Sequence, residues 1–269
     1  MAQLFRSPKS ASDWTDHDLK SYNIGILTCT PEEFFPAGPD PSLDHLDPAI
    51  LNSPLGLTDR ICSSEAATYL DAIDLAVKIP QERQVDGFVT ETLRVLGFDN
   101  PPASITSGYI TPLTICGETR KAQTDICAIH VPTLILLVLV ENKTLHNNRD
   151  PEAQVIAEAI AAFQHNNDRR TELNLGALDT MTIPCITLSG TRPTFYLVPV
   201  TTELSEAVGD GRPSLIRTSV LRCSTGVRRA RRSSTGMADI DYRKLALRHF
   251  LAFKGLAKSH WVKVLEGIV

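Results

Sequence analysis

The chain has 269 residues, of which 42% are hydrophobic and 22% charged, and its formal net charge is −4. These values are typical of a soluble globular protein built as one large domain or one domain with appendages. The longest almost wholly apolar run, 131–140, is about half of the roughly 20 residues that a membrane-spanning helix needs. Residues 1–10 lack the apolar stretch of a signal peptide, and the six cysteines form no C-x-x-C pair. We therefore expect an intracellular protein in a reducing compartment that contacts no membrane.

Charge is distributed unevenly along the chain. Residues 212–269 hold thirteen lysines and arginines against three acids, a local net charge of +10, so the remainder carries −14. Such a division predicts an acidic body with a basic C-terminal region. That region would meet nucleic acid, an acidic surface or the body of the protein itself.

The first elements are an arm and two helices. Residues 1–57 are rich in proline, aspartate and serine and show no sustained period, which predicts a mostly irregular N-terminal arm. Apolar residues recur at helical spacing over 58–79, behind serines that can cap a helix. After Pro80 a second apolar stripe predicts a helix over 81–96, with Gly97 as its stop.

The middle of the chain predicts a sheet. Three β-rich runs, 109–117, 123–130 and 133–143, are separated by short turns and predict an antiparallel meander. Residues 151–164 have the period and alanine content of a helix that begins at Pro151. Two further strands, 181–190 and 194–201, precede a helix-like segment, so the order from residue 81 is α-β-β-β-α-β-β-α, a mixed α/β layer.

The boundaries follow from this order. We expect an α/β core over 58–208, a basic linker over 209–238 and a C-terminal helical segment over 239–269, formed by one amphipathic helix or a pair broken near Gly255. No internal repeat is visible.

The run 131–140 leads directly into Glu141, Asn142 and Lys143. Residues two apart on a strand point to the same side, so Glu141 and Lys143 are expected to project together. Asp125 precedes them on the neighbouring strand. A symmetric turn around Val131 and Pro132 leaves Asp125 about three residues out of register with Glu141, or roughly 10 Å, so a shared site needs a shifted turn, twist or a bulge.

Two carboxylates and a lysine at a sheet edge suit one kind of chemistry. Carboxylate oxygens bind Mg²⁺ or Mn²⁺ and leave metal positions open for water and a phosphate oxygen. The metal lowers the pKa of a bound water and neutralises charge on the phosphoryl group, while an ammonium orients or stabilises the attacking hydroxide. The pattern predicts phosphodiester hydrolysis.

These residues resemble the metal motif of the PD-(D/E)XK nuclease superfamily, which has a restriction-endonuclease-like fold. The likeness rests on Asp125, on Glu141-x-Lys143 after an apolar strand, and on an element order that matches the family's α-β-β-β-α-β core. It implies that Asp125 and Glu141 bind metal and that Lys143 positions the nucleophilic water. It further implies that a glutamate on the first core helix completes the metal shell, with Glu91 as the candidate and Glu82 as its rival.

RecB-like members of the family place a glutamine on the helix after the third strand, where this chain has Gln154. By resemblance, Gln154 would support the lysine or the substrate. Two residues depart from the family pattern. Thr124 stands where a proline often precedes the aspartate, and Glu158 stands where RecB-like members have a tyrosine four residues after the glutamine.

The partner implied is DNA or RNA. Six basic residues are candidates for phosphate contact: Arg120, Lys121, Arg228, Arg229, Arg231 and Arg232. The cluster at 227–234 would equally suit a nuclear-localisation signal or a basic linker. Two other functional classes stay open: a catalytically inactive nucleic-acid-binding or protein-interaction module, and a globular protein whose acidic body docks its own basic tail.

Overall fold

The computed structural model describes residues 6–56, 61–79, 81–143, 151–226 and 233–268. Its centre is one mixed sheet with the strand order β1-β7-β6-β5-β4-β3-β2. The strands are β1 (Ile24–Thr28), β2 (Ala103–Ile115), β3 (Glu118–His130), β4 (Ile135–Lys143), β5 (Thr180–Ser189), β6 (Arg192–Thr201) and β7 (Thr218–Ser224). The protein is therefore an α/β protein, as the sequence predicts.

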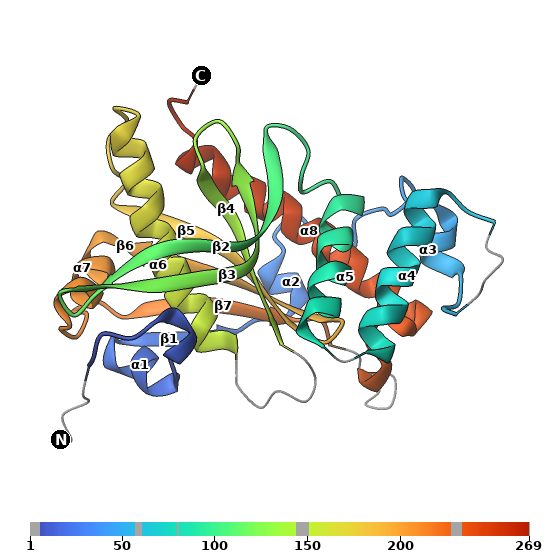
Figure 1. Ribbon diagram of the computed structural model, residues 1–269, viewed down its shortest axis with the longest axis horizontal. Coiled ribbons are helices and arrows are strands. Elements are labelled where there is room, and N and C mark those ends of the chain that lie inside the picture. Colours follow the sequence, from blue (N-terminus) through green and yellow to red (C-terminus); the bar gives the residue numbers. More distant parts are fainter. Residues whose placement is uncertain (1–5, 57–60, 80, 144–150, 227–232, 269) are drawn as a thin grey trace.

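Helices flank the sheet and cover its ends (Figure 1). The α-helices are α1 (Asp16–Ser21), α2 (Pro31–Phe34), α3 (Pro48–Asn52), α4 (Ser64–Lys78), α5 (Glu82–Val95), α6 (Pro151–Glu172), α7 (Thr202–Asp210) and α8 (Ile240–Val264). The described residues also include two 3₁₀ segments, η1 (Ala11–Asp13) and η2 (Ser233–Ala238). Helices α3, α4 and α5 lie at one end of the molecule and α7 lies at the other (Figure 1).

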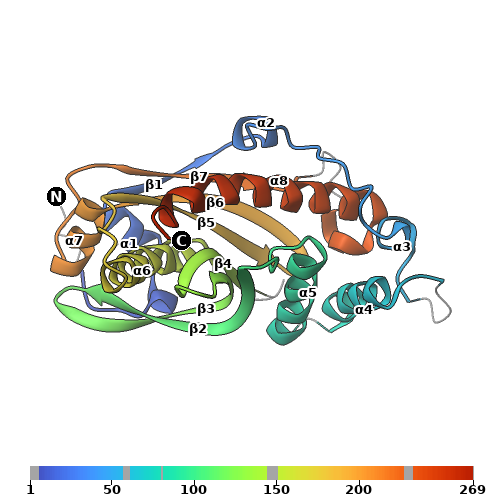
Figure 2. The same ribbon diagram turned by 90° about the horizontal axis from the view of Figure 1, so that it is seen from above.

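Strands β2, β3 and β4 form the expected antiparallel meander, and α6 then connects β4 to the parallel strand β5. Helix α6 packs on the face that carries Cys127 and Cys185. Burial, the larger cause, and the charge of Glu158 on α6 raise the pKa of both thiols. Helix α8 packs on the opposite face, where Phe250 and Phe253 contact Phe195 at centroid distances of 5.3 and 4.9 Å. Figure 2 shows α8 running along the sheet. The core thus has two apolar layers separated by the sheet.

The sheet extends beyond residues 58–208 on both sides. Strand β1 comes from the expected irregular arm and pairs in parallel with β7, which comes from the expected basic linker. Strand β7 in turn pairs with β6. Gly25 of β1 leaves room for the Arg217 guanidinium, because a Cβ there would lie 2.8 Å from the Arg217 Nη2 atom. The expectations of an irregular arm and a linker are wrong for these two segments.

Helix α8 is one continuous helix of 25 residues rather than a broken pair. Gly255 lies within it, and a Cβ at this position would meet no atom within 4 Å. A single glycine weakens a helix by about 1 kcal/mol relative to alanine, which the packing of an apolar face readily outweighs. A mid-helix glycine was therefore insufficient evidence for a break.

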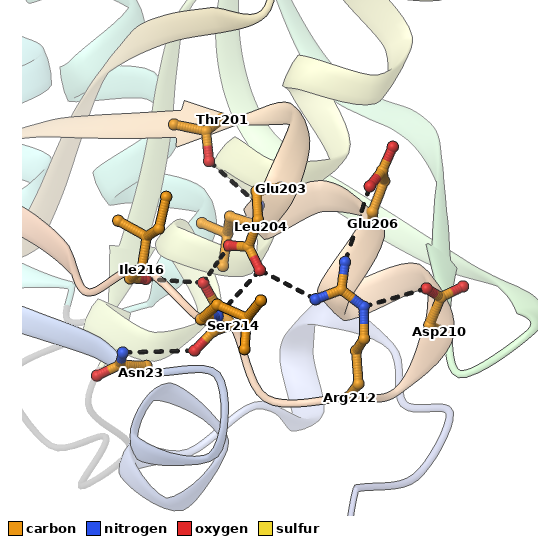
Figure 3. A network of polar contacts seen from close by, with 10 residues as sticks. Asn23, Thr201, Glu203, Leu204, Glu206, Asp210, Arg212, Ser214 and Ile216 are labelled. Atoms are coloured by element: carbon orange, nitrogen blue, oxygen red, sulfur yellow. Dashed lines mark hydrogen bonds and ion pairs between the residues drawn. The ribbon is translucent and has the colours of Figure 1, made fainter.

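A polar network fixes the loop between α7 and β7 (Figure 3). The Glu203 carboxylate accepts hydrogen bonds from the Ser214 hydroxyl, the Leu215 N–H and the Arg212 guanidinium. Arg212 also lies within ion-pair distance of Glu206 and Asp210. Because the contacts join the first turn of α7 to residues 212–215, they hold β7 in line with β6.

Substituting Glu203 by glutamine is expected to destabilise the protein by about 1–2 kcal/mol at neutral pH. Burial, the largest single influence, raises the pKa of Glu203, but the bonds from Ser214, Leu215 and Arg212 outweigh it and the net pKa lies below 4.5. A depressed folded-state pKa contributes stability that is present above the unfolded-state pKa and is lost as the pH falls through the folded-state pKa. The stability difference between wild type and Glu203→Gln should therefore narrow below about pH 4.5.

Urea unfolding at pH 7 and pH 3.5 would measure this difference. Glu206→Gln is the matched control, because the Glu206 side chain is 63% exposed and lies 3.7 Å from Arg212. The control should show a small effect at both pH values. A difference for Glu203→Gln that stayed constant across the range would contradict the proposed ionic role of this carboxylate.

Candidate active site

Asp125 and Glu141 lie on neighbouring strands at opposed positions. The last recorded pair of β3 with β4 is Ile126 with Val140, so one further step places Asp125 across from Glu141. The offset of three residues that a symmetric turn would give is removed by two features, a shifted turn and a register shift. The turn at 131–134 is centred further along the chain than expected, and the register shifts between Ala128 and Ile129. The structure therefore places the two residues at opposed positions on neighbouring strands.

The sheet is irregular beside Asp125. On its other side the position across from Asp125 is Gly108 of β2, which has a φ of +64°. This left-handed conformation favours glycine and is strained for a residue with a side chain. Next to this distortion, the Asp125 side chain contacts the neighbouring strand β4. Its Oδ2 atom accepts a hydrogen bond of 2.8 Å from the Asn142 N–H.

Asn142 is held from two sides. Its backbone N–H donates to Asp125, and its side-chain Nδ2 donates to the Asp86 Oδ1 atom of α5 over 2.8 Å. Asn142 itself is fully buried. Since Asn142 stands between Glu141 and Lys143, these two hydrogen bonds fix the end of β4 and thereby the backbone of the Glu-x-Lys motif.

Of the two acids Asp86 and Glu91 on α5, it is Asp86 that contacts the end of β4. Glu91 forms a 2.7 Å ion pair with Arg94 on its own helix. At about 100° per residue, Glu91 lies roughly 140° around the helix from Asp86, whereas Asp86 lies within about 20° of the buried Leu93. The helical projection therefore favours Asp86. Among the described residues, Glu91 forms no hydrogen bond or ion pair with Asp125 or Glu141, and its ion pair is with Arg94.

Helix α6 presents a second polar pair beneath the sheet. The Gln154 Nε2 atom donates to the Glu158 Oε1 atom over 3.0 Å. Glu158 is 1% exposed, and together with burial, the larger cause, its charge raises the pKa of the Cys127 thiol to about 12. The same two causes raise the pKa of Cys185. Gln154 is thus fixed by the residue that stands in the tyrosine position of RecB-like proteins.

A line of polar side chains continues from Glu141 across the sheet. Glu141 pairs with Thr187 of β5, Thr187 with Thr194 of β6, and Thr194 with Ser224 of β7. Cross-strand partners point to the same face, so these groups share the face covered by α6. Glu141 is fully buried and Thr187 is 4% exposed, while the Thr194 and Ser224 hydroxyls form an exposed contact of 3.2 Å. Nothing in the sequence distinguishes Thr187 from an ordinary strand threonine.

Arg222 of β7 joins the first turn of α6 to this face. Its Nη1 atom lies 3.1 Å from the Glu152 carboxylate and its Nη2 atom donates to Thr28 of β1 over 2.9 Å. Glu152 is 7% exposed. The sequence grouped Arg222 with a basic linker, whereas the structure gives it a place in the sheet.

Two of the six expected nucleic-acid contacts lie in the described part of the chain, and both lie away from Asp125. Arg120 and Lys121 lie on β3 itself, and Arg120 pairs with Glu118 over 2.6 Å. Five residues separate Arg120 from Asp125, about 17 Å along a strand. The other four candidates, Arg228, Arg229, Arg231 and Arg232, lie outside the described residues.

The residues fit a divalent cation in part. Asp125 and Glu141 supply two carboxylates at one point of the sheet, and carboxylate oxygens are the ligands that Mg²⁺ and Mn²⁺ prefer. Among the residues that the structure describes, no group of three or more histidine, cysteine, aspartate and glutamate side chains could hold a metal ion. Glu91 therefore adds no third ligand, and backbone or water oxygens would complete the coordination.

Comparison with known proteins gives no match: no protein-family model matches the chain, and no curated protein matches its sequence. Within the described part of the chain, none of the helices has both the length and the apolar character required to cross a membrane.

Proposed function

We propose that the protein is a metal-dependent nuclease that hydrolyses phosphodiester bonds of DNA or RNA, with a site that resembles that of the PD-(D/E)XK superfamily. One observation carries the proposal: Asp125 and Glu141 lie across from each other at the end of β4, two residues before Lys143. The element order α5-β2-β3-β4-α6-β5 supports it, because the acids fall on the second and third strands of that order.

Each residue has a role in this proposal. Asp125 and Glu141 hold Mg²⁺ or Mn²⁺, which supplies Lewis acidity at the scissile phosphate. Lys143 orients the attacking water and stabilises the negative charge that develops at phosphorus. Asp86 acts through Asn142 and is a positioning residue for β4, since its carboxylate holds the Asn142 side chain. Gln154, fixed by Glu158, supports the lysine or the substrate.

Lys143→Ala tests the proposal directly. Loss of one group that stabilises charge in the transition state lowers turnover by about 10²–10³-fold or more. We expect this loss in Mn²⁺-dependent cleavage of single- and double-stranded DNA and RNA, with metal and substrate binding retained. Lys78→Ala is the matched control, because it removes the same charge from an exposed position on α4. Undiminished cleavage by Lys143→Ala would refute the assignment.

A separate observation supports a second candidate function. Asp125 and Asp86 both accept hydrogen bonds from Asn142, which gives two of the acids a structural role at the end of β4. The fold would then serve as a noncatalytic module that binds nucleic acid or protein. In that case Asp125→Asn should leave binding unchanged, and nucleic-acid affinity should fall with salt according to the number of phosphate contacts.

A further inference from the structure

Two cysteines lie side by side where β1 and β7 form one end of the sheet (Figure 2). The last pair of these parallel strands is Thr28 with Arg222, so one further step places Cys29 beside Cys223. The ladder continues through this step, because the Cys29 N–H donates to the Arg222 carbonyl over 2.8 Å. Paired residues of neighbouring strands point to the same face of a sheet, so the two thiols share one face.

The Cys29 sulfur lies on the side of β1 that faces β7. Alternate residues of a parallel strand direct both N–H and C=O at the same neighbour, as the Asn23 carbonyl and the Cys29 N–H do toward β7. The Leu27 carbonyl belongs to the same alternation, and the Cys29 Sγ atom lies 3.8 Å from its oxygen. Cys223 is close enough for its ionisation to depend on Cys29. Burial is the largest cause that raises the pKa of Cys223 to about 12, and the charge of Cys29 is the next.

The spacing suits a disulfide. Neighbouring strands lie about 4.8 Å apart, and a disulfide joins residues whose Cα atoms are about 4.4–6.8 Å apart. Cys127 and Cys185 do not meet this condition, because they flank Leu139 on opposite sides and are therefore about two strand spacings apart. Both Cys29 and Cys223 are free thiols, the first partly exposed and the second fully buried. A small oxidant from solvent therefore meets Cys29 first and finds Cys223 behind it.

We propose that Cys29 and Cys223 form a reversible disulfide when the protein is exposed to hydrogen peroxide. Peroxide oxidises the Cys29 sulfur to a sulfenic acid: an S–O bond forms, the O–O bond breaks and one water leaves. The Cys223 sulfur then attacks the Cys29 sulfur. The S–S bond forms, the S–O bond breaks, and the hydroxyl group leaves as a second water with the Cys223 proton. Two thiols and one peroxide thus give one disulfide and two waters, and a small dithiol reverses the reaction by exchange.

The bond would join β1 covalently to the sheet. Residues 12–17 precede β1 and, with Ala153 and Gln154 on α6, line a cavity of about 430 Å³. Segments near a chain end and at a sheet edge open more readily than a central strand does. Oxidation is therefore expected to hold the N-terminal segment in its place beside α6. This inference does not depend on the proposed nuclease function.

The test is oxidation of the full chain, first reduced and then freed of reductant, with graded amounts of hydrogen peroxide. Alkylation of the remaining thiols, followed by peptide mass spectrometry without reduction, identifies the linked residues. We expect one intramolecular link between Cys29 and Cys223, with the free thiols falling from six to four and returning to six on addition of dithiothreitol. The melting temperature of the oxidised protein should rise by at least about 4 °C.

Three variants complete the experiment. Cys29→Ser should keep Cys223 reduced and show no rise in melting temperature. Cys62→Ser is the matched control, because Cys62 is also a partly exposed thiol, and it should oxidise as the wild type does. In Cys223→Ala the oxidation of Cys29 should stop at the sulfenic acid, which dimedone traps. The melting curve of each reduced variant shows whether it is folded.

The wild-type result decides the inference even if a variant does not fold. A peptide that links either cysteine to a different residue, a dimer linked through Cys29, or oxidation of Cys29 without loss of the Cys223 thiol would overturn it. So would a wild-type protein that keeps all six thiols, or a disulfide that leaves the melting temperature unchanged.

Discussion

Replacing Asp125 by asparagine and Glu141 by glutamine together is expected to abolish binding of Mn²⁺ and Mg²⁺ and, with it, phosphodiester cleavage. The two carboxylates occupy opposed positions on β3 and β4, so a cation held between them loses both of its charged ligands in the double variant. Calorimetric titration of metal at millimolar concentration measures the binding. Thermal unfolding gives a second measurement, because a ligand at a hundred times its Kd stabilises the folded state by about 2.7 kcal/mol.

Asp168→Asn/Glu206→Gln is the matched control, because it removes the same charge from exposed positions that line a different cavity. It should bind metal as the wild type does. Wild-type protein that binds no metal under these conditions would contradict the proposed chemistry and favour the noncatalytic module. Metal binding that survives in the double variant would show that the cation is held elsewhere.

Arg243→Met is expected to destabilise the protein by about 3–5 kcal/mol. Arg243 is fully buried at the start of α8 and donates to the backbone carbonyls of Met237, Ile50 and Ser53 over 2.9–3.0 Å. Methionine fills much of the same volume but offers none of these hydrogen bonds, so the carbonyl groups lose their charged donor. Urea unfolding at neutral pH measures the difference.

Arg248→Met is the control on the same helix. Its guanidinium is 43% exposed and lies 3.7 Å from Asp40, so its loss should change the free energy of unfolding by less than about 0.5 kcal/mol. Similar effects of the two substitutions would mean that the Arg243 contacts contribute little. Arg243 belongs to the basic C-terminal region, for which nucleic-acid contact is one expectation. Because Arg243 is fully buried, it is not available for such a contact.

Elements with a long, regular pattern could be predicted from the sequence. Strands β4 to β6 and helix α5 lie within about two residues of their expected ranges because their apolar periods are sustained. Helix α4 begins about six residues later than expected, β2 and β3 begin about six and five residues earlier, and α6 continues about eight residues further. Strands β1 and β7 were missed because each is short. The first contains a glycine within a proline-rich segment, and arginines flank or interrupt the second. Strand β1 is held at the sheet by its pairing with β7, and β7 pairs with both β1 and β6.

The candidate site could be predicted in part. The sequence identified Asp125 and Glu141, but their register depended on the length of one turn and on a bulge, which local patterns do not determine. Asp86 was passed over in favour of Glu91, although its position on the helical projection is closer to the buried stripe. The link between Gln154 and the N-terminal segment depends on tertiary packing alone, so no sequence pattern could reveal it.

The pairing of β1 with β7 has a consequence for biosynthesis. Thr28 and Arg222, which the completed edge brings into hydrogen-bond contact, are 194 residues apart in the chain. At about 5–20 residues per second, β1 leaves the ribosome roughly 10–40 s before its partner strand is made. During that interval β1 has no partner strand, and a contact between such distant segments is slow to form. We therefore expect chaperones to protect nascent chains of this protein until β7 emerges from the ribosome.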